Sequence, residues 1–292
     1  MIKTVENGKV TAQIDTRGGQ LLSLKKGETE YLWQRDPAFW SSCAPVLFPV
    51  VGRQRENRIV VEGRSYPMPM HGFLRDTELE TVEEASDRLT LRLQSDEETK
   101  KMYPWDFSFQ MTFVLAGDTL TQSFVVENQD TEKLYFCLGG HPGFRVPLAE
   151  GEQFSEYQLI FEKDEPLVSD GLEGGVILPE ETYELPREGN VLTVNEELFR
   201  EGNTLIFENL QSSFVELTGP AGRGVRVSYE GFSTLAFWTK GVPDNAPFLC
   251  IEPWCGMGMR AGEEEEFSKK SGVISLMPGE TYSAVFSIQV KS

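Results

Sequence analysis

The amino-acid sequence predicts an all-β fold, and one large antiparallel β-sandwich with few short helices is the simplest architecture that fits it. Short segments in which apolar and polar residues alternate recur along the 292-residue chain. Alternation with a period of two turns one face of a strand toward the interior and leaves the other face more polar. The sequence contains no long amphipathic helical segment, which argues against a parallel α/β architecture.

The expected strands are short and are separated by turn residues. Phe107–Leu115 and Leu120–Val126 are joined by Ala116–Thr119, a glycine-containing connection typical of a β-hairpin. The same alternation predicts further strands at Val10–Asp15, Leu89–Gln94, Tyr157–Phe161, Ser213–Leu217, Gly224–Tyr229, Thr234–Trp238 and Tyr282–Ile288.

Helical signals are few. Thr193–Glu196 resembles a capping box ahead of Glu197–Arg200, and Gly202 would end that helix. Asp96–Met102 is expected to form one or two turns before Pro104.

Charge and composition limit the partners that the protein can bind. The net charge is −19. A surface this acidic repels nucleic-acid phosphates and anionic membranes, so neither is expected as a partner. The first residues lack an apolar signal segment, and no apolar run reaches the roughly 18 residues of a membrane span. A cytoplasmic location is therefore expected.

The cysteines and the absence of linkers bear on the organisation of the chain. Four cysteines are scattered without paired spacing, which predicts reduced thiols and no metal site. No low-complexity segment divides the chain, so residues 1–292 are expected to form one domain, as a monomer or a homodimer.

The two histidines of the chain each lie in a glycine-flanked motif. His71 is in Met70-His71-Gly72-Phe73, and His141 is in Gly139-Gly140-His141-Pro142-Gly143-Phe144. Glu252 lies between apolar neighbours in Cys250-Ile251-Glu252-Pro253-Trp254. Histidine titrates near neutral pH, so these three side chains are candidates for the proton donor and acceptor of acid–base catalysis. Their spacing requires different strand ends to converge on one face.

Other residues fit a groove for a sugar. Arg53 follows an apolar segment in Val50-Val51-Gly52-Arg53, and its planar donors suit hydroxyl or ring oxygens. Aromatic side chains can lie against the apolar faces of a pyranose; the candidates are Trp33, Phe39, Trp40, Phe73, Phe144, Trp238 and Trp254.

Four ordered motifs resemble those of the aldose 1-epimerases, the galactose mutarotase-like proteins, and the LacX-like branch most of all. They are Pro45–Arg53, Met70–Phe73, Gly140–Phe144 and Ile251–Trp254, and together they span nearly the whole chain. The resemblance implies the galactose mutarotase-like supersandwich, a large antiparallel β-sandwich with the sugar site on a concave face.

The resemblance also implies a reaction, the interconversion of the α and β anomers of an aldose without a cofactor. Glu252 would be the general base that takes the proton of the anomeric hydroxyl, and His141 would be the general acid at the ring oxygen. His71 would hold or polarise the ring-oxygen region. Arg53 would bind sugar oxygens, and Trp238, Trp254 and Phe144 are the expected aromatic contacts.

The sequence departs from the galactose enzymes and leaves alternatives open. Their Asp-His-Asn-type segment, which binds sugar hydroxyls, is missing, so the natural aldose is undefined and a broad sugar preference is expected. A phosphorylated sugar would require Arg35, Arg55 or Arg75 to lie beside the site. A sugar-binding or sugar-sensing protein with little catalysis is the main alternative. A glycoside hydrolase is a further one, although that chemistry uses two carboxylates and only Glu252 has a motif-like setting.

Overall fold

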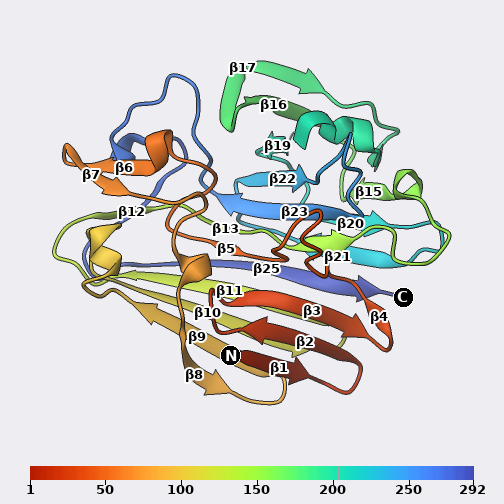
Figure 1. The fold of residues 1–292 in the computed structure, drawn as a ribbon, viewed down its shortest axis with the longest axis horizontal. Coiled ribbons are helices and arrows are strands. Elements are labelled where there is room, and N and C mark those ends of the chain that lie inside the picture. The colour runs from red at the N-terminus through yellow and green to blue at the C-terminus, as the bar shows by residue number, and fades with distance from the viewer. Residues whose placement is uncertain (203) are drawn as a thin grey trace.

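Antiparallel strands form layered sheets, as Figure 1 shows. The structure, a computed structural model, describes residues 1–202 and 204–292. Within these residues, sheets of nine, six and four strands are accompanied by three two-stranded ribbons. The predicted all-β sandwich is therefore confirmed.

The nine-stranded sheet contains the predicted hairpin. Its two strands pair antiparallel from Ala116 with Thr119 to Phe107 with Asn128, so both are longer than the sequence pattern indicated. The strands in sheet order are β18 (Val191–Thr193), β15 (Gln158–Phe161), β20 (Phe214–Thr218), β21 (Gly224–Ser228), β25 (Thr281–Lys291), β11 (Thr119–Asn128), β10 (Phe107–Ala116), β9 (Arg88–Gln94) and β8 (Glu80–Glu84).

One face of the six-stranded sheet packs on the main core, and its other face carries two smaller hydrophobic clusters. It comprises β19 (Thr204–Glu208), β22 (Thr234–Trp238), β23 (Phe248–Cys255), β13 (Leu138–Gly140) and β5 (Val46–Leu47), with β14 (Gly143–Arg145) also paired to β23. On β23, Leu249 and Ile251 belong to the main core, whereas Cys250 and Trp254 belong to two smaller clusters. Because side chains alternate along a strand, Glu252 points to the same face as Cys250 and Trp254.

The remaining strands complete the sandwich. The ribbon of β16 (Val168–Glu173) and β17 (Val176–Glu184) lies against β19, where the backbone N–H of Ile206 donates to the Ser169 hydroxyl over 2.9 Å. The four-stranded sheet is β1 (Ile2–Glu6), β2 (Val10–Asp15), β3 (Gln20–Lys26) and β4 (Thr29–Glu30), and the ribbons are β6 (Arg58–Val61) with β7 (Arg64–Pro67), β12 (Leu134–Phe136) with β24 (Ile274–Leu276), and β16 (Val168–Glu173) with β17 (Val176–Glu184).

One hydrophobic cluster joins the three larger sheets, with members such as Ile14, Phe109 and Phe237. Phe48, which follows β5, is fully buried near its centre, and its ring centroid lies 4.9 Å from that of Phe109 and 5.9 Å from that of Phe136. Aromatic pairs of this kind contribute about 0.5–1.5 kcal/mol each beyond the burial of their area. The core thereby holds the six-stranded sheet against the nine-stranded sheet.

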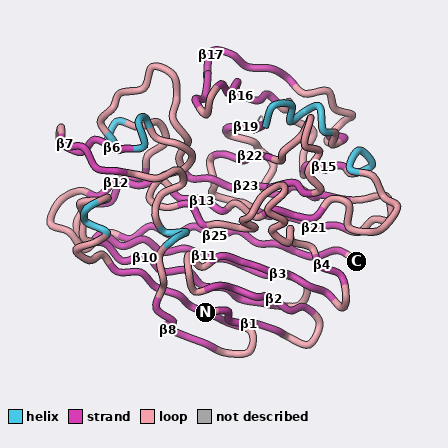
Figure 2. Tube along the Cα trace, viewed as in Figure 1, coloured by secondary structure: helices cyan, strands magenta, loops and turns pink. Residues whose placement is uncertain are grey.

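The short helices are 3-10 turns (Figure 2). The predicted turn at residues 96–102 is present, and the Asp96 carboxylate accepts the backbone N–H of Thr99. The predicted capping box is wrong in its first residue: Thr193 ends β18, and Asn195 instead accepts the N–H of Leu198. The helices are η1 (Arg55–Asn57), η2 (Leu74–Asp76), η3 (Thr99–Lys101), η4 (Phe154–Glu156), η5 (Glu196–Gly202) and η6 (Phe267–Lys269).

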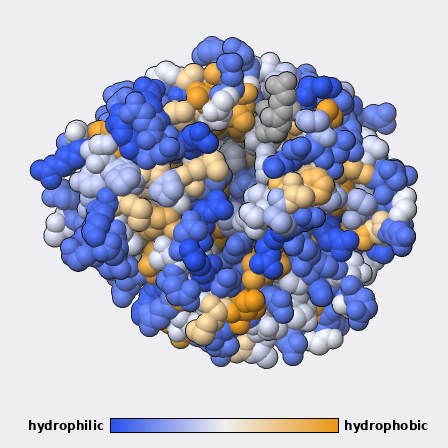
Figure 3. Space-filling model, viewed as in Figure 1, coloured by the Kyte–Doolittle hydropathy of each residue, from blue (hydrophilic) through white to orange (hydrophobic). Residues whose placement is uncertain are grey.

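The surface is mostly hydrophilic on the face drawn in Figure 3, in keeping with the net charge of −19. Among the described residues, no helix is long and apolar enough to span a membrane.

Candidate active site

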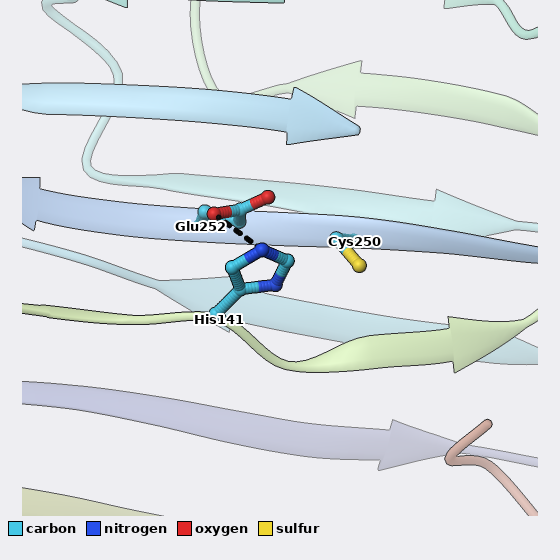
Figure 4. A group of neighbouring side chains, drawn as sticks. All are labelled: His141, Cys250 and Glu252. Carbon is cyan, nitrogen blue, oxygen red and sulfur yellow. Dashed lines mark ion pairs between the residues drawn. The ribbon is translucent and has the colours of Figure 1, made fainter. Parts of the chain in front are cut away.

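The segment Gly139-Gly140-His141-Pro142-Gly143, which runs from β13 into β14, places His141 opposite Glu252. β13 pairs Gly139 with Trp254, and β14 pairs Gly143 with the residue two positions before Glu252. When the pairing of either strand with β23 is continued by two residues toward the other, His141 lies across from Glu252. The imidazole Nε2 lies 3.2 Å from a carboxylate oxygen of Glu252 (Figure 4).

Two of the glycines are required by close packing beside this pair. A Cβ atom on Gly139 would lie 2.7 Å from Cδ1 of Trp254, and one on Gly143 would lie 2.9 Å from the ring of Trp40. Contacts this short would displace the indoles, so only glycine lets the backbone approach them. The motif around His141 is thus a packing requirement as well as a functional signal.

Burial opposes charge on both members of the pair. Residue exposure is 7% for His141 and 1% for Glu252. Desolvation raises the pKa of Glu252 well above its usual value, against a smaller opposite effect of the Trp254 indole. Desolvation lowers the pKa of His141 well below its usual value, and the charge of Arg75 acts in the same direction. Burial therefore favours the neutral state of the pair, in which Glu252 carries the one titratable proton that the two groups share.

Each member of the pair also has a buried polar atom whose hydrogen-bonding capacity is not fully used. Among the described residues, Nδ1 of His141 is buried and lacks a hydrogen-bond partner, and Oε2 of Glu252 has only the 3.2 Å contact with Nε2 of His141. A buried polar atom without a partner costs about 1–3 kcal/mol. A ligand that supplies hydroxyl groups would remove part of that cost.

His71 is fixed as a neutral donor. Its backbone has a left-handed φ of 68°, and its Nδ1 accepts the backbone N–H of Gly52 over 3.1 Å. Burial lowers the pKa of His71 to about 3, and the charge of Arg75 contributes. A neutral ring that accepts at Nδ1 carries its proton on Nε2. The ring centroids of His71 and His141 are 5.5 Å apart.

A cavity of about 350 Å³ opens beside these groups, and His71, His141 and Glu252 all line it. Three tryptophans form part of its wall. Trp40, Trp238 and Trp254, all named from the sequence as candidate sugar contacts, line the cavity. The Trp40 ring centroid lies 5.1 Å from that of His141. This size suits a small ligand with apolar faces, such as one sugar ring.

The ribbon β16–β17 forms another part of the wall, which the sequence interpretation missed. Leu172, Gly174, Gly175 and Ile177 line the cavity. The ribbon is held in place by a backbone hydrogen bond, in which the N–H of Ile177 donates to the carbonyl oxygen of Met259 over 2.8 Å. The Gly174-Gly175 dipeptide, which forms its turn, is the sequence signal that could have indicated a hairpin here.

Two arginines bring positive charge to the cavity. Arg53 lines it as predicted, and Arg75 does so as well, whereas Arg35 and Arg55 do not. Neither Arg53 nor Arg75 forms an ion pair with another described residue. Glu252 is the one carboxylate among the described residues that line the cavity.

Phe144 is not part of the cavity wall, contrary to the sequence prediction. Its side chain is 1% exposed and belongs to the main core. Gly143, its neighbour on β14, faces Trp40 beside the cavity. Because side chains alternate along a strand, Phe144 must point to the opposite side.

The whole chain resembles proteins of one family. Residues 1–289 match the family model described as aldose 1-epimerase. The chain belongs to the aldose 1-epimerase family. LacX of Lactococcus lactis subsp. lactis is 29% identical over 296 residues, covering 98% of each chain. The uncharacterized protein YphB of Escherichia coli K12 is 26% identical and covers 99% of each chain.

Solved structures of similar proteins share the fold. A galactose mutarotase related enzyme from Lactobacillus acidophilus is 29% identical with a TM-score of 0.95, covering 100% of this chain and 98% of its own. A galactose mutarotase-like protein from Lactobacillus casei is 29% identical with a TM-score of 0.92, covering 100% of both chains. In this aldose 1-epimerase family member, the four residues whose roles the resemblance implied, His71, His141, Glu252 and Arg53, line one cavity.

Proposed function

We propose that the protein interconverts the α and β anomers of an aldose by acid–base ring opening and reclosure. The observation that carries the proposal is the buried pair of His141 Nε2 and Glu252, 3.2 Å apart at the wall of a cavity large enough for one sugar. Membership of the aldose 1-epimerase family supports the same reaction.

The pair can exchange the two protons that the reaction moves. Transfer of the shared proton from Glu252 to His141 gives a carboxylate and an imidazolium. The carboxylate takes the proton of the anomeric hydroxyl while the imidazolium protonates the ring oxygen, and the C1–ring oxygen bond breaks. The pair still holds one proton, now on Glu252. Rotation about C1–C2 and reclosure in reverse yield the other anomer.

The other cavity residues would position the sugar. The Nε2–H of His71 can donate to the ring oxygen or a neighbouring hydroxyl, because its Nδ1 is occupied by Gly52. Trp40, Trp238 and Trp254 offer faces for the apolar side of a pyranose. These contacts concern features common to many aldoses, so we propose a broad preference among neutral sugars.

A second candidate substrate is an aldose that bears an anionic group. It is favoured by Arg53 and Arg75, two cavity arginines without a carboxylate partner among the described residues. Arginine binds phosphate and carboxylate groups by paired, charge-assisted hydrogen bonds. A hexose 6-phosphate and its parent hexose therefore belong in the same assay.

The deciding experiment follows anomer equilibration by polarimetry or NMR over glucose, galactose and their 6-phosphates. Wild-type protein should accelerate at least one of them, and Glu252→Gln should not. Calorimetric titration of the same sugars separates the alternative of a sugar-binding protein, which would bind one of them without accelerating its mutarotation. If the protein neither binds any sugar in the panel nor accelerates its mutarotation, both the enzymatic and the sugar-binding function are contradicted.

A further inference from the structure

The thiol of Cys250 lies beside the acid–base pair and is not used by the proposed reaction. Cys250 and Glu252 are two residues apart on β23, so their side chains project from the same face of the strand. One ligand atom each from His141, Cys250 and Glu252 lie within 4.8 Å of one another (Figure 4). All three side chains are buried.

We propose that His141, Cys250 and Glu252 form a binding site for a thiophilic divalent cation of the zinc class, which competes with the sugar. Imidazole nitrogen, thiolate sulfur and carboxylate oxygen are the ligands that Zn²⁺ binds in proteins. Bond lengths of about 2.0–2.3 Å require donor atoms within about 4 Å of one another, so the three side chains need to close by about 1 Å.

The charges of the site favour a divalent ion. A bound M²⁺ with one thiolate, one carboxylate and one neutral imidazole gives a complex of zero net charge. A neutral complex suits a buried site, where an uncompensated charge is costly. The ion would also give a further partner to Oε2 of Glu252, which among the described residues has only the 3.2 Å contact with Nε2 of His141.

Access and the fourth ligand come from the cavity. His141 and Glu252 line it, whereas Cys250 is fully buried behind them. An ion can therefore enter along the path of the sugar, meet the pair first, and bind the thiol last. Water or a sugar hydroxyl in the cavity would fill the fourth position, as in open tetrahedral sites.

Binding of the ion releases protons. The Cys250 thiol loses its proton to solvent as the metal–sulfur bond forms, and the proton held by His141 and Glu252 leaves as well. With two protons released per ion, the affinity should rise by up to about a hundredfold per pH unit while the thiol and the pair are both protonated. The occupied pair can no longer transfer protons, so the ion would inhibit the enzyme; this last step rests on the proposed function.

Cadmium is the probe, because a cadmium–thiolate bond has an ultraviolet charge-transfer absorption that reports binding without turnover. Wild-type protein should show this band on titration with Cd²⁺, and Cys250→Ala should lose it. Cys43→Ala is the matched control, because Cys43 lies close to Cys250 but is not one of the three proposed ligands. A Cβ atom on Gly143 would lie 3.2 Å from the carbonyl oxygen of Cys43 and 3.3 Å from the sulfur of Cys250. The Cys43→Ala variant should keep the band.

Two further measurements complete the test. Cys250→Ser is examined in parallel in case the alanine variant fails to fold, and it should bind Cd²⁺ more weakly than wild type by at least about tenfold. For each variant, the mutarotation rate with the metal is divided by its own rate without it, and only the Cys250 variants should escape inhibition.

The results separate this proposal from the proposed function. A band that persists in both Cys250 variants, or is absent from wild type, would overturn the metal site whether or not the protein is an epimerase. A Cys250-dependent band in a protein without mutarotase activity would support the metal site and contradict the enzyme assignment.

Discussion

The backbone N–H of Gly52 donates to Nδ1 of His71 over 3.1 Å, and this bond fixes which ring nitrogen faces the cavity. The same two residues are joined by a second bond, from the His71 N–H to the Gly52 carbonyl over 2.9 Å. The motifs that carry Arg53 and His71 are thereby held together, although they are separate in the sequence.

The first prediction concerns this ring. Because burial lowers the pKa of His71 to about 3, its imidazole should stay neutral with the proton on Nε2 from pH 8 down to about pH 5. Long-range ¹H–¹⁵N NMR spectra report the tautomer, and His141→Gln leaves His71 as the single imidazole to observe. An imidazolium signal at pH 6 would contradict the assignment.

The lowered pKa of His71 also links stability to pH. A group whose pKa is lower in the folded state takes up protons mainly on unfolding, so its stabilising contribution is complete above the unfolded value. For His71 that contribution is lost as the pH falls from about 6.5 toward about 3. The free energy of unfolding of His71→Gln should therefore decrease less over this interval than that of wild type.

The second prediction is that Glu252→Gln lowers activity and raises stability. General acid–base groups contribute about 10²–10⁴-fold, so the mutarotation rate should fall by about that factor. The pKa of Glu252 is raised in the folded state, so its stabilising contribution is present below the unfolded value of about 4.5 and is lost as the pH rises through the folded value. The neutral amide of the Glu252→Gln variant avoids this loss. Its free energy of unfolding, measured by urea denaturation at pH 8, should therefore be higher than that of wild type.

Glu165 supplies a matched control for the second prediction. It is also a buried glutamate, but its carboxylate accepts the backbone N–H groups of Gln211 and Ser212 and the Ser212 hydroxyl. Glu165→Gln should therefore destabilise the protein at pH 8, because one acceptor oxygen becomes a donor. A loss of stability in Glu252→Gln as large as that in Glu165→Gln would contradict the interpretation of Glu252.

The fold was predictable wherever alternation was strict. Val10–Asp15 was predicted to the residue, because its alternating apolar side chains pack into the core on one face. Thr234–Trp238 was also predicted to the residue, although its first four residues are buried on both faces of the strand. The ribbon β16–β17 escaped prediction: its register shifts between Asp170 and Gly171, and Pro179 interrupts the second strand. A segment without regular alternation gives no strand signal, even where it lines the site.

Parts of the site could not be predicted for a different reason. The four motifs indicated that His71, His141, Glu252 and Arg53 would converge, and they line one cavity. The direction in which Phe144 points depends on the pairing of β14 with β23, which no local pattern of residues specifies. Whether Arg75 or Arg55 lines the cavity likewise depends on how loops that are far apart in the sequence pack together.

The third prediction concerns the charge of the substrate. If the natural aldose bears a phosphate, Arg75→Met should lower kcat/KM for a hexose 6-phosphate by about 10–100-fold, since a hydrogen bond to a charged group contributes about 1.5–3 kcal/mol. The same variant should change kcat/KM for the parent hexose much less. Arg55→Met is the control, because Arg55 lies outside the cavity and pairs with Glu265. Equal losses for both sugars would exclude a phosphate contact at Arg75.

The same assay tests the breadth of the neutral-sugar preference. Discrimination between glucose and galactose requires a buried polar partner for the hydroxyl that differs, because an unpaired partner penalises the wrong epimer. Beyond Glu252, no carboxylate among the described residues lines the cavity. We expect kcat/KM for the two sugars to differ by less than about a hundredfold, and a larger galactose advantage would contradict this expectation.

The last prediction tests whether the ribbon β16–β17 contributes to binding. Leu172 lines the cavity and packs against the cluster that contains Trp254 and Ile206, so Leu172→Ala should remove apolar contact with the bound sugar. Because this wall is separate from the acid–base pair, KM should rise by about 5–30-fold, the equivalent of roughly 1–2 kcal/mol, while kcat changes little. Val168 provides the control on the same ribbon: it is 43% exposed and outside the cavity, so Val168→Ala should leave both constants unchanged. A fall in kcat without a change in KM would show that the ribbon acts on the pair rather than on the sugar.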